Sequence, residues 1–164
     1  MKIILNNNDL LKKKCLNVDL KTGFKIAKRM GMFLNTLKKK TNTKIVGLAA
    51  NQVGIDACVC IAIKNSKPFV LINPKIISFS NVRIRNKEQC LSYPDIELDI
   101  YRHMWVEVSC DNHKETIFFG NVSLESDTIK NLESAVVQHE IAHLHGLTFH
   151  DFQWNNAPTP AEWN

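Results

Sequence analysis

Hydrophobic residues follow a helical spacing in the first quarter of the chain. Between Gly23 and Lys40 they recur every three or four positions, at Phe24, Ala27, Met30, Phe33, Leu34 and Leu37. This spacing predicts an amphipathic N-terminal helix. The lysine triplet 38–40 would stabilise its C-terminal end, and the polar run 41–43 ends it.

The middle of the chain changes to short apolar runs that are rich in β-branched and aromatic residues. These runs are 57–63, 69–72, 75–79, 105–110 and 116–119. Turn-forming residues such as Pro68, Pro74 and Gly120 separate them. Because the connections are short, we expect mostly antiparallel strands.

A second helical pattern begins near Ser126 or Asp127 and continues to Leu144, where Gly146 marks its end. Its stripe consists of Ile129, Leu132, Ala135, Val136, His139, Glu140 and His143. The order helix, strands, helix predicts an α+β fold in which antiparallel sheets pack around the C-terminal helix. Residues 151–164 lack a helical period, and we expect an extended or partly ordered segment there.

Length and composition indicate one domain that spans residues 1–164. The chain is 45% hydrophobic and 23% charged, which is ordinary for a globular protein. The apolar run 3–5 is too short for a signal-peptide core, and the longest run, 57–63, is too short to span a bilayer. We therefore expect a cytoplasmic protein with no membrane partner.

The formal net charge of +5 comes mainly from lysine clusters at 12–14 and 38–40. The first interpretation is that these clusters are solvated helix ends. The second is a weak association with a surface rich in nucleic acid, such as that of the ribosome. No aromatic residues are interleaved within these clusters, so we expect no specific nucleic-acid partner.

The five cysteines do not indicate a disulfide framework, because their number is odd and nothing suggests secretion. Cys58 and Cys60 alternate with Val59 and Ile61, which indicates small buried residues on a strand. Cys90 differs, because its surroundings are polar and irregular. We expect it to lie between strands, where its thiol can point into a site.

The stretch from His139 to His143 has the pattern His-Glu-x-x-His. Two histidines four residues apart lie on one face of a helix, so both imidazoles can reach one metal ion. Glu140 between them can accept a proton from water in the site. The pattern therefore predicts a metal-dependent hydrolase.

The third ligand separates two kinds of site. In one class of zinc protease, a third histidine follows the motif, but the corresponding position here is Phe149, and His150 comes one residue late. His145 should lie off the ligand face. The alternative is the thiolate of Cys90, which with two histidines leaves a fourth tetrahedral position for water.

The segment 46–55 is rich in small residues, which allow a backbone to approach a ligand closely. Within it, Gln52 offers an uncharged amide among apolar neighbours. A tight strand crossing in the core is the alternative interpretation of this segment.

Taken together, these three segments resemble the peptide deformylase family. The family's Gly-x-Gly-Leu-Ala-Ala-x-Gln motif matches residues 45–52 except that Ile45 replaces the first glycine. Its Glu-Gly-Cys-Leu-Ser motif matches 88–92 with Gln89 in place of glycine. Its Gln-His-Glu-x-Asp-His-Leu-x-Gly motif matches 138–146 with Ala142 in place of aspartate. The order and approximate separation of the motifs also agree.

This resemblance implies an iron(II)-dependent amidase that removes the N-formyl group from the N-formylmethionine of nascent polypeptides. The ligands of its single divalent ion would be Cys90, His139 and His143. Fe²⁺ is expected in the cell, and Zn²⁺ or Ni²⁺ could replace it in purified protein. Glu140 would transfer the proton of the water, while the Gln52 side chain and the Leu91 backbone N–H would hold the oxyanion.

The methionine side chain of such a substrate needs an apolar slot. The helix stripe and the first motif offer Val46, Leu132, Ala135 and Val136 for it, although core packing is an alternative role for Leu132 and Val136. By the same resemblance, Gly47 and Gln89 would also contact the substrate.

None of the three departures from the family motifs removes a reacting group. Ile45 would narrow or reshape the wall beside the substrate. Ala142 would remove an ion pair and leave Arg102 free. The chain also lacks the long C-terminal helix of many bacterial members, which suggests a compact variant in the cytoplasm of a bacterium or, if phage-encoded, of its host.

Two alternatives remain open from the sequence. One is a small zinc metalloprotease of the His-Glu-x-x-His type. The other is a catalytically impaired relative that binds formyl peptides without turning them over.

Overall fold

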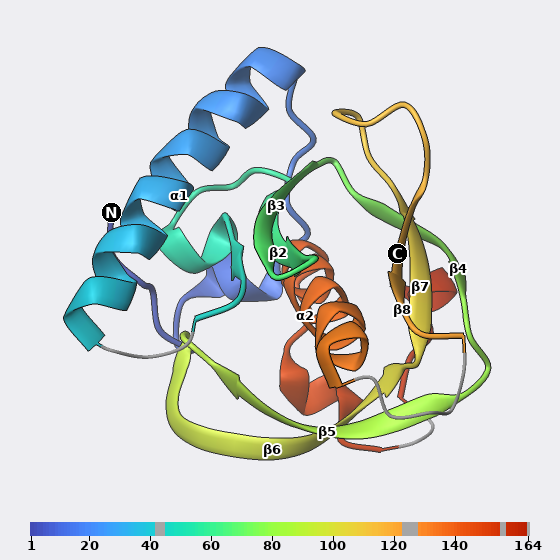
Figure 1. The fold of residues 1–164 in the computed structure, drawn as a ribbon. Helices are drawn as coiled ribbons and strands as arrows, with labels where there is room; N and C mark the ends of the chain where they lie inside the picture. Colours follow the sequence, from blue (N-terminus) through green and yellow to red (C-terminus); the bar gives the residue numbers. More distant parts are fainter. Residues whose placement is uncertain (42–44, 123–127, 155–156, 164) are drawn as a thin grey trace.

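The computed structural model describes residues 1–41, 45–122, 128–154 and 157–163. Its fold is α+β, as predicted, with two α-helices and eight strands in the described residues (Figure 1). The helices are α1 (Leu20–Thr41) and α2 (Thr128–Leu144). The strands are β1 (Leu48–Ala49), β2 (Val59–Lys64), β3 (Lys67–Ile72), β4 (Lys75–Phe79), β5 (Arg83–Cys90), β6 (Tyr93–His103), β7 (Trp105–Ser109) and β8 (Ile117–Gly120).

The strands form three antiparallel sheets, which confirms the predicted strand direction. Their orders are β1-β2-β3, β4-β7-β8 and the two-stranded β5-β6. Figure 1 shows α2 in the centre, with β2 and β3 beside one end, β4, β7 and β8 on another side, and the β5-β6 hairpin curving beneath it. The helix contacts strands of all three sheets, so residues on it meet side chains from every layer.

Helix α2 is buried around nearly its whole circumference in its second half. Val136, Val137, Ile141 and Leu144 enter the main hydrophobic core. Polar residues of the same turns, including Gln138, Glu140 and His143, are buried as well. Polar side chains inside a core need partners or a function, because desolvation without compensation costs free energy.

Helix α1 covers a second hydrophobic cluster formed with β1, β2 and β3 (Figure 1). It begins at Leu20, three residues before the predicted start, because the Asp19 carboxylate accepts a hydrogen bond from the Thr22 backbone N–H at 3.0 Å. Its buried residues are Gly23, Ala27, Met30 and Leu34. A Cβ at Gly23 would overlap Ile72, so glycine lets the helix approach β3 closely.

One part of the prediction was wrong. The hairpin of β5 and β6 was not predicted, and Cys90 is the last residue of β5 rather than part of a connection between strands. The described parts of the tail contain the 3₁₀ helices η3 (Phe149–Phe152) and η4 (Pro160–Glu162), and Trp163 is buried. The predicted cap residues of α2, Ser126 and Asp127, lie outside the described residues.

The expectation of buried cysteines without disulfides was confirmed. All five cysteines are free and buried, and Cys60 lies on β2 with Cys58 directly before it. Burial raises the pKa of the Cys58 thiol to about 11, which suits an unreactive core residue. Among the described residues, neither helix is long and apolar enough to cross a membrane.

Candidate metal centre

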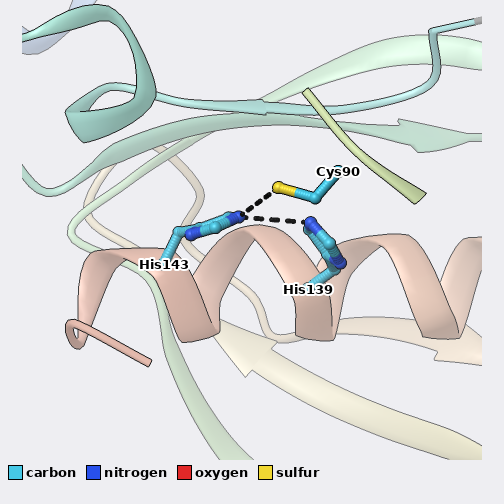
Figure 2. Close-up of side chains that lie close together, drawn as sticks. All are labelled: Cys90, His139 and His143. Atoms are coloured by element: carbon cyan, nitrogen blue, oxygen red, sulfur yellow. Dashed lines mark hydrogen bonds between the residues drawn. The ribbon is translucent and has the colours of Figure 1, made fainter. Parts of the chain in front are cut away.

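Three buried side chains converge between α2 and the end of β5. His139 and His143 project from successive turns of α2 toward Cys90, as Figure 2 shows. The Cys90 Sγ lies 3.2 Å from His143 Nε2, and that nitrogen lies 3.2 Å from His139 Nε2. Helical spacing therefore supplies two of the donor atoms, and the strand end supplies the third.

These separations fit a single bound metal ion. A tetrahedral ion with bonds of about 2.3 Å to sulfur and about 2.0 Å to nitrogen needs donor atoms roughly 3.3 to 3.6 Å apart. All donor atoms of Cys90, His139 and His143 lie within 4.8 Å of one another, and no other group of metal-binding side chains is found in the described part of the chain. Cysteine and histidine donors suit zinc, iron or nickel better than calcium or magnesium.

A buried carboxylate orients the first histidine. Glu88 Oε2 lies 2.8 Å from His139 Nδ1, which directs His139 Nε2 toward Cys90 and His143. Burial opposes the charge on His139, but the hydrogen bonds to Cys90 and Glu88 raise its pKa to about 10. A metal ion that binds His139 Nε2 would displace the proton from that nitrogen.

Glu88 is in turn held by Arg102, with both contacts at 2.8 Å. Burial alone would raise the pKa of Glu88, but the Arg102 guanidinium and His139 lower it to about 2. The carboxylate therefore stays ionised near neutral pH. Such a partner increases the basicity of a histidine that ligates a metal.

Gln52 approaches the same point from η2 (Asn51–Val53). Its Oε1 accepts a hydrogen bond from the Ala49 backbone N–H at 2.9 Å, which fixes the orientation of the amide. The amide Nε2 then lies 3.4 Å from Cys90 Sγ and 3.3 Å from His143 Nε2. An uncharged N–H donor is thus directed at the space where the three donor atoms meet.

Glu140 lies beside the cluster and is buried. Its Oε2 has no hydrogen-bond partner among the described residues. Burial raises the pKa of Glu140 to about 7, a value suited to a group that both takes up and releases a proton near neutral pH. Gly47 faces it, and a Cβ at that position would overlap the Glu140 carboxyl group.

The sequence was also compared with models of known protein families. The family model described as polypeptide deformylase matches residues 1–156. The chain belongs to this family. A peptide deformylase of Borreliella burgdorferi is 36% identical over 111 residues, which cover 65% of this chain and 62% of the relative. One of Aquifex aeolicus is 31% identical over 157 residues, which cover 91% of this chain and 85% of the relative.

Solved deformylase structures share the fold. A variant of Arabidopsis thaliana peptide deformylase 1B superposes with a TM-score of 0.76 at 23% identity, over 96% of this chain and 82% of that one. The Met-Ala-Ser-bound peptide deformylase of Acinetobacter baumannii gives a TM-score of 0.74 at 24% identity, over 93% of this chain and 97% of that one. At these identities the likeness concerns the fold.

The other residues named from the deformylase resemblance differ in burial. Ala135 and Val136 are buried on α2, while Val46 and Leu132 are half-buried against the main core. Leu91 follows Cys90 directly at the turn after β5. Gln89 is exposed, and its side chain donates to Glu97 Oε2 at 3.3 Å on the neighbouring strand.

Histidines outside the cluster have other partners. The His145 Nδ1 lies 2.6 Å from the Trp163 carbonyl oxygen, as expected for a residue off the ligand face. The His150 ring packs against Tyr93 and Phe149. Phe149 itself is buried in the core, at the position where the protease pattern would need a histidine.

One expectation about the deformylase motif departures was wrong, and another stays a prediction. Ile45 is buried in the cluster under α1, and its effect on the wall beside the substrate is the untested prediction. Arg102 is not left free by Ala142, because it pairs with Glu88. Ala142 is 1% exposed and packs in the main core.

The sequence reasoning also missed the role of Glu88. A signal was present, because Glu88 and Cys90 are two residues apart on one strand and therefore face the same side. Recognising it required the strand assignment, which the sequence pattern did not supply.

Proposed function

We propose that this chain is an active metal-dependent peptide deformylase. It would remove the formyl group from the N-formylmethionine of nascent polypeptides and release formate. The observation that carries the proposal is the convergence of Cys90, His139 and His143, with Gln52 Nε2 and the Glu140 carboxyl group beside them.

Cys90, His139 and His143 would hold one divalent ion, Fe²⁺ in the cell and Zn²⁺ or Ni²⁺ in some purified samples. When bound, such an ion supplies Lewis-acid polarisation of the formyl carbonyl and lowers the pKa of water at the site. Glu88 would keep His139 Nδ1 protonated and its Nε2 directed at the ion, while Arg102 keeps Glu88 ionised.

Glu140 would act as general base and then as general acid. Its carboxylate would take a proton from the attacking water and pass it to the amide nitrogen of the leaving peptide. The pKa of about 7 that burial produces supports this double role. A Cβ at Gly47 would overlap the carboxyl group, so the glycine leaves the space that this group occupies.

Gln52 and Leu91 would stabilise the oxyanion that forms as water attacks the formyl carbon. The Gln52 Nε2 is already directed at the site by the hydrogen bond from Ala49 to its Oε1. The Leu91 backbone N–H would supply a second donor. Losing one such donor typically slows a reaction by about 100- to 1000-fold.

The apolar residues Val46, Leu132, Ala135 and Val136 would form the slot for the methionine side chain. Their location on α2 one or two turns before His139, or directly before Gly47, supports this assignment. The backbones of Gly47 and Gln89 would contact the peptide. The Acinetobacter baumannii relative binds Met-Ala-Ser, which matches the product of such a reaction.

The test is formate release from formyl-Met-Ala-Ser by protein loaded with Fe²⁺ or Ni²⁺. We expect turnover that falls by about 100- to 10,000-fold in Glu140→Gln, while the metal content stays at one ion per chain. Release no faster than that of the variant would contradict the proposal. Tight binding of the peptide without turnover would instead identify the impaired, peptide-binding relative.

The protease alternative predicts a different metal ligand, His150 in place of Cys90. A zinc protease with His150 as ligand would keep its metal in Cys90→Ser and lose it in His150→Ala. We expect the reverse, because Cys90 lies in the donor cluster and His150 packs on Tyr93. Metal content after dialysis separates the two cases.

We also propose a single cytoplasmic domain that associates weakly with ribosomes through α1. This helix carries seven basic and no acidic residues, and Lys21, Lys25 and Lys28 are exposed. Such binding should weaken as salt is raised. We expect Lys21→Glu/Lys25→Glu to lower co-sedimentation with ribosomes, whereas the control Lys67→Glu/Lys114→Glu should not. Equal losses in both variants would contradict a role for α1.

A further inference from the structure

A cavity of about 430 Å³ lies on the side of α2 that faces away from the metal centre. Ile141, Leu144 and His145 line it, and at roughly 100° per residue Ile141 points about 200° away from His139. The remaining walls come from Cys58, from residues 73–76, from Lys14, Cys15 and Asn17 in the N-terminal segment, and from Pro160, Ala161 and Trp163 in the tail. The volume falls within the usual range of small-molecule sites.

The cavity combines apolar walls with positive charge. Ile76, Ile141, Leu144 and Trp163 provide aliphatic and aromatic surface. Lys14 and Lys75 are the charged residues of the lining. Burial raises the pKa of the Cys58 thiol in the wall; Lys14 and Lys75 act against this rise, and Asp111 adds to it.

No carboxylate among the described residues lines this cavity. Carboxylates that neighbour the lining residues have partners of their own. Glu162, between Ala161 and Trp163, accepts hydrogen bonds from the Thr159 backbone N–H at 2.7 Å and from the Thr159 hydroxyl at 2.6 Å. Asp56 pairs with Lys13 at 2.6 Å, and Asp111 accepts a hydrogen bond from Asn73 Nδ2 at 2.6 Å. A negatively charged ligand would therefore meet cations without a carboxylate in direct contact.

The tail fixes the shape of the cavity. The Trp163 carbonyl accepts a hydrogen bond from His145 Nδ1 at 2.6 Å, and the Trp163 indole N–H donates to the Pro158 carbonyl at 3.2 Å. The Trp163 ring also packs on Phe152 with ring centroids 5.4 Å apart. Because these contacts order the tail, the cavity exists before a ligand arrives.

We propose that this cavity binds a small amphipathic carboxylate. The apolar body would lie against Ile141, Leu144 and Trp163, and the carboxylate would face Lys14 and Lys75. These two lysines are the cationic residues of the lining and supply its positive charge. This site is independent of the proposed deformylase activity, because none of its lining residues belongs to the metal cluster.

The test is calorimetric titration of the metal-loaded protein with decanoate, with decylammonium as a probe of equal length and opposite charge. We expect one decanoate per chain and at least tenfold weaker binding of decylammonium. Lys14→Ala/Lys75→Ala should weaken decanoate binding at least tenfold, and Ile76→Trp, which fills the cavity, should abolish it. The control Lys21→Ala/Lys25→Ala has the same net charge as the first variant and should bind like the unaltered protein.

Three outcomes would overturn the proposal. The first is equal decanoate affinity in the two double-lysine variants. The second is equal affinity for decanoate and decylammonium. The third is competitive displacement of decanoate by formyl-Met-Ala-Ser, which would locate the probe at the metal centre. None of these readouts depends on catalytic turnover, so a failed deformylase assay leaves the test intact.

Discussion

Gly47 is a residue at which one methyl group should change catalysis without unfolding the protein. A Cβ there would overlap the Glu140 carboxyl group, which would have to move. We predict that Gly47→Ala lowers kcat for formyl-Met-Ala-Ser by about 10- to 100-fold, since small displacements of a catalytic group cost rates of this order. Metal content should remain at one ion per chain.

Gly31→Ala is the matched control, because a Cβ at Gly31 has no neighbour within 4 Å in the described structure. It lies in α1, where alanine replaces glycine with a gain of roughly 0.5 to 1 kcal/mol. We expect unchanged kcat and slightly higher stability. A similar loss of kcat in both variants would show that the effect at Gly47 is not local.

His103 makes stability depend on pH. Burial lowers its pKa from 6.5 to about 4, so the folded state disfavours the protonated ring. Between these two values the unfolded chain binds more protons, and stability therefore falls as the pH decreases from about 6.5 to about 4. Linkage gives a loss of about 2 kcal/mol from pH 7 to pH 5 for this group.

The measurement is the free energy of unfolding in urea at pH 7 and pH 5, for the unaltered protein and for His103→Gln. Other histidines contribute equally to both proteins, so the difference between their pH responses isolates His103. The variant should lose about 2 kcal/mol less on acidification. If the unaltered protein and His103→Gln lose equal stability between pH 7 and pH 5, the pH dependence does not come from His103.

For individual residues, the sequence predicted which side chains form the metal-binding cluster but not which side chains position them. Cys90, His139 and His143 carry recognisable motif positions, and the structure brings them together. Their support by Glu88 and Arg102 depends on pairing across a hairpin, and Arg102 lies 14 positions away from Glu88. Spacing along one strand or helix carries no information about such a contact.

Among the elements, the β5-β6 hairpin combines a buried ion pair with an exposed one. Arg102 is 1% exposed and pairs with Glu88, whereas Arg85 is 63% exposed and pairs with Asp99. We predict that Arg102→Ala destabilises the protein by about 3 to 5 kcal/mol, because it leaves Glu88 charged and buried. Arg85→Ala should cost at most about 1 kcal/mol.

Urea unfolding of both variants at pH 7 tests this contrast. Arg102→Ala should also weaken metal retention on dialysis, since Glu88 would lose the partner that holds its carboxylate in place against His139. Arg85→Ala should retain metal like the unaltered protein. Equal costs in the two variants would contradict the importance of burial for this pair.

The same hairpin explains why strand prediction failed there. The inward face of β5 consists of Ile84, Asn86, Glu88 and Cys90. Asn86 and Glu88 are polar, and Cys90 belongs to the metal-binding cluster, so only Ile84 is an ordinary apolar core residue. An alternation of apolar and polar residues is the signal for a half-buried strand, and a strand that builds a polar site lacks it. In contrast, β2 has the apolar run Val59–Ile63 and was predicted.

For the molecule as a whole, the fold class followed from element order, but the packing of the tail did not. The segments Phe149–Phe152 and Pro160–Glu162 form two short 3₁₀ helices, which are too short for a helical period to be recognised in the sequence. Their order comes from tertiary contacts of Phe149, Phe152 and Trp163 with the main core. Local sequence patterns do not encode contacts of this kind.

The tail therefore offers a test of long-range stabilisation with two tryptophans. Trp163 is 5% exposed, packs on Phe152 and His145, and donates a hydrogen bond to Pro158, whereas Trp154 is 70% exposed. We predict that Trp163→Ala lowers the free energy of unfolding by about 3 kcal/mol, because it leaves a large void in the core. Trp154→Ala should change it by less than about 0.5 kcal/mol. Urea titrations followed by circular dichroism measure both, and equal effects would mean that the tail adds no packing to the fold.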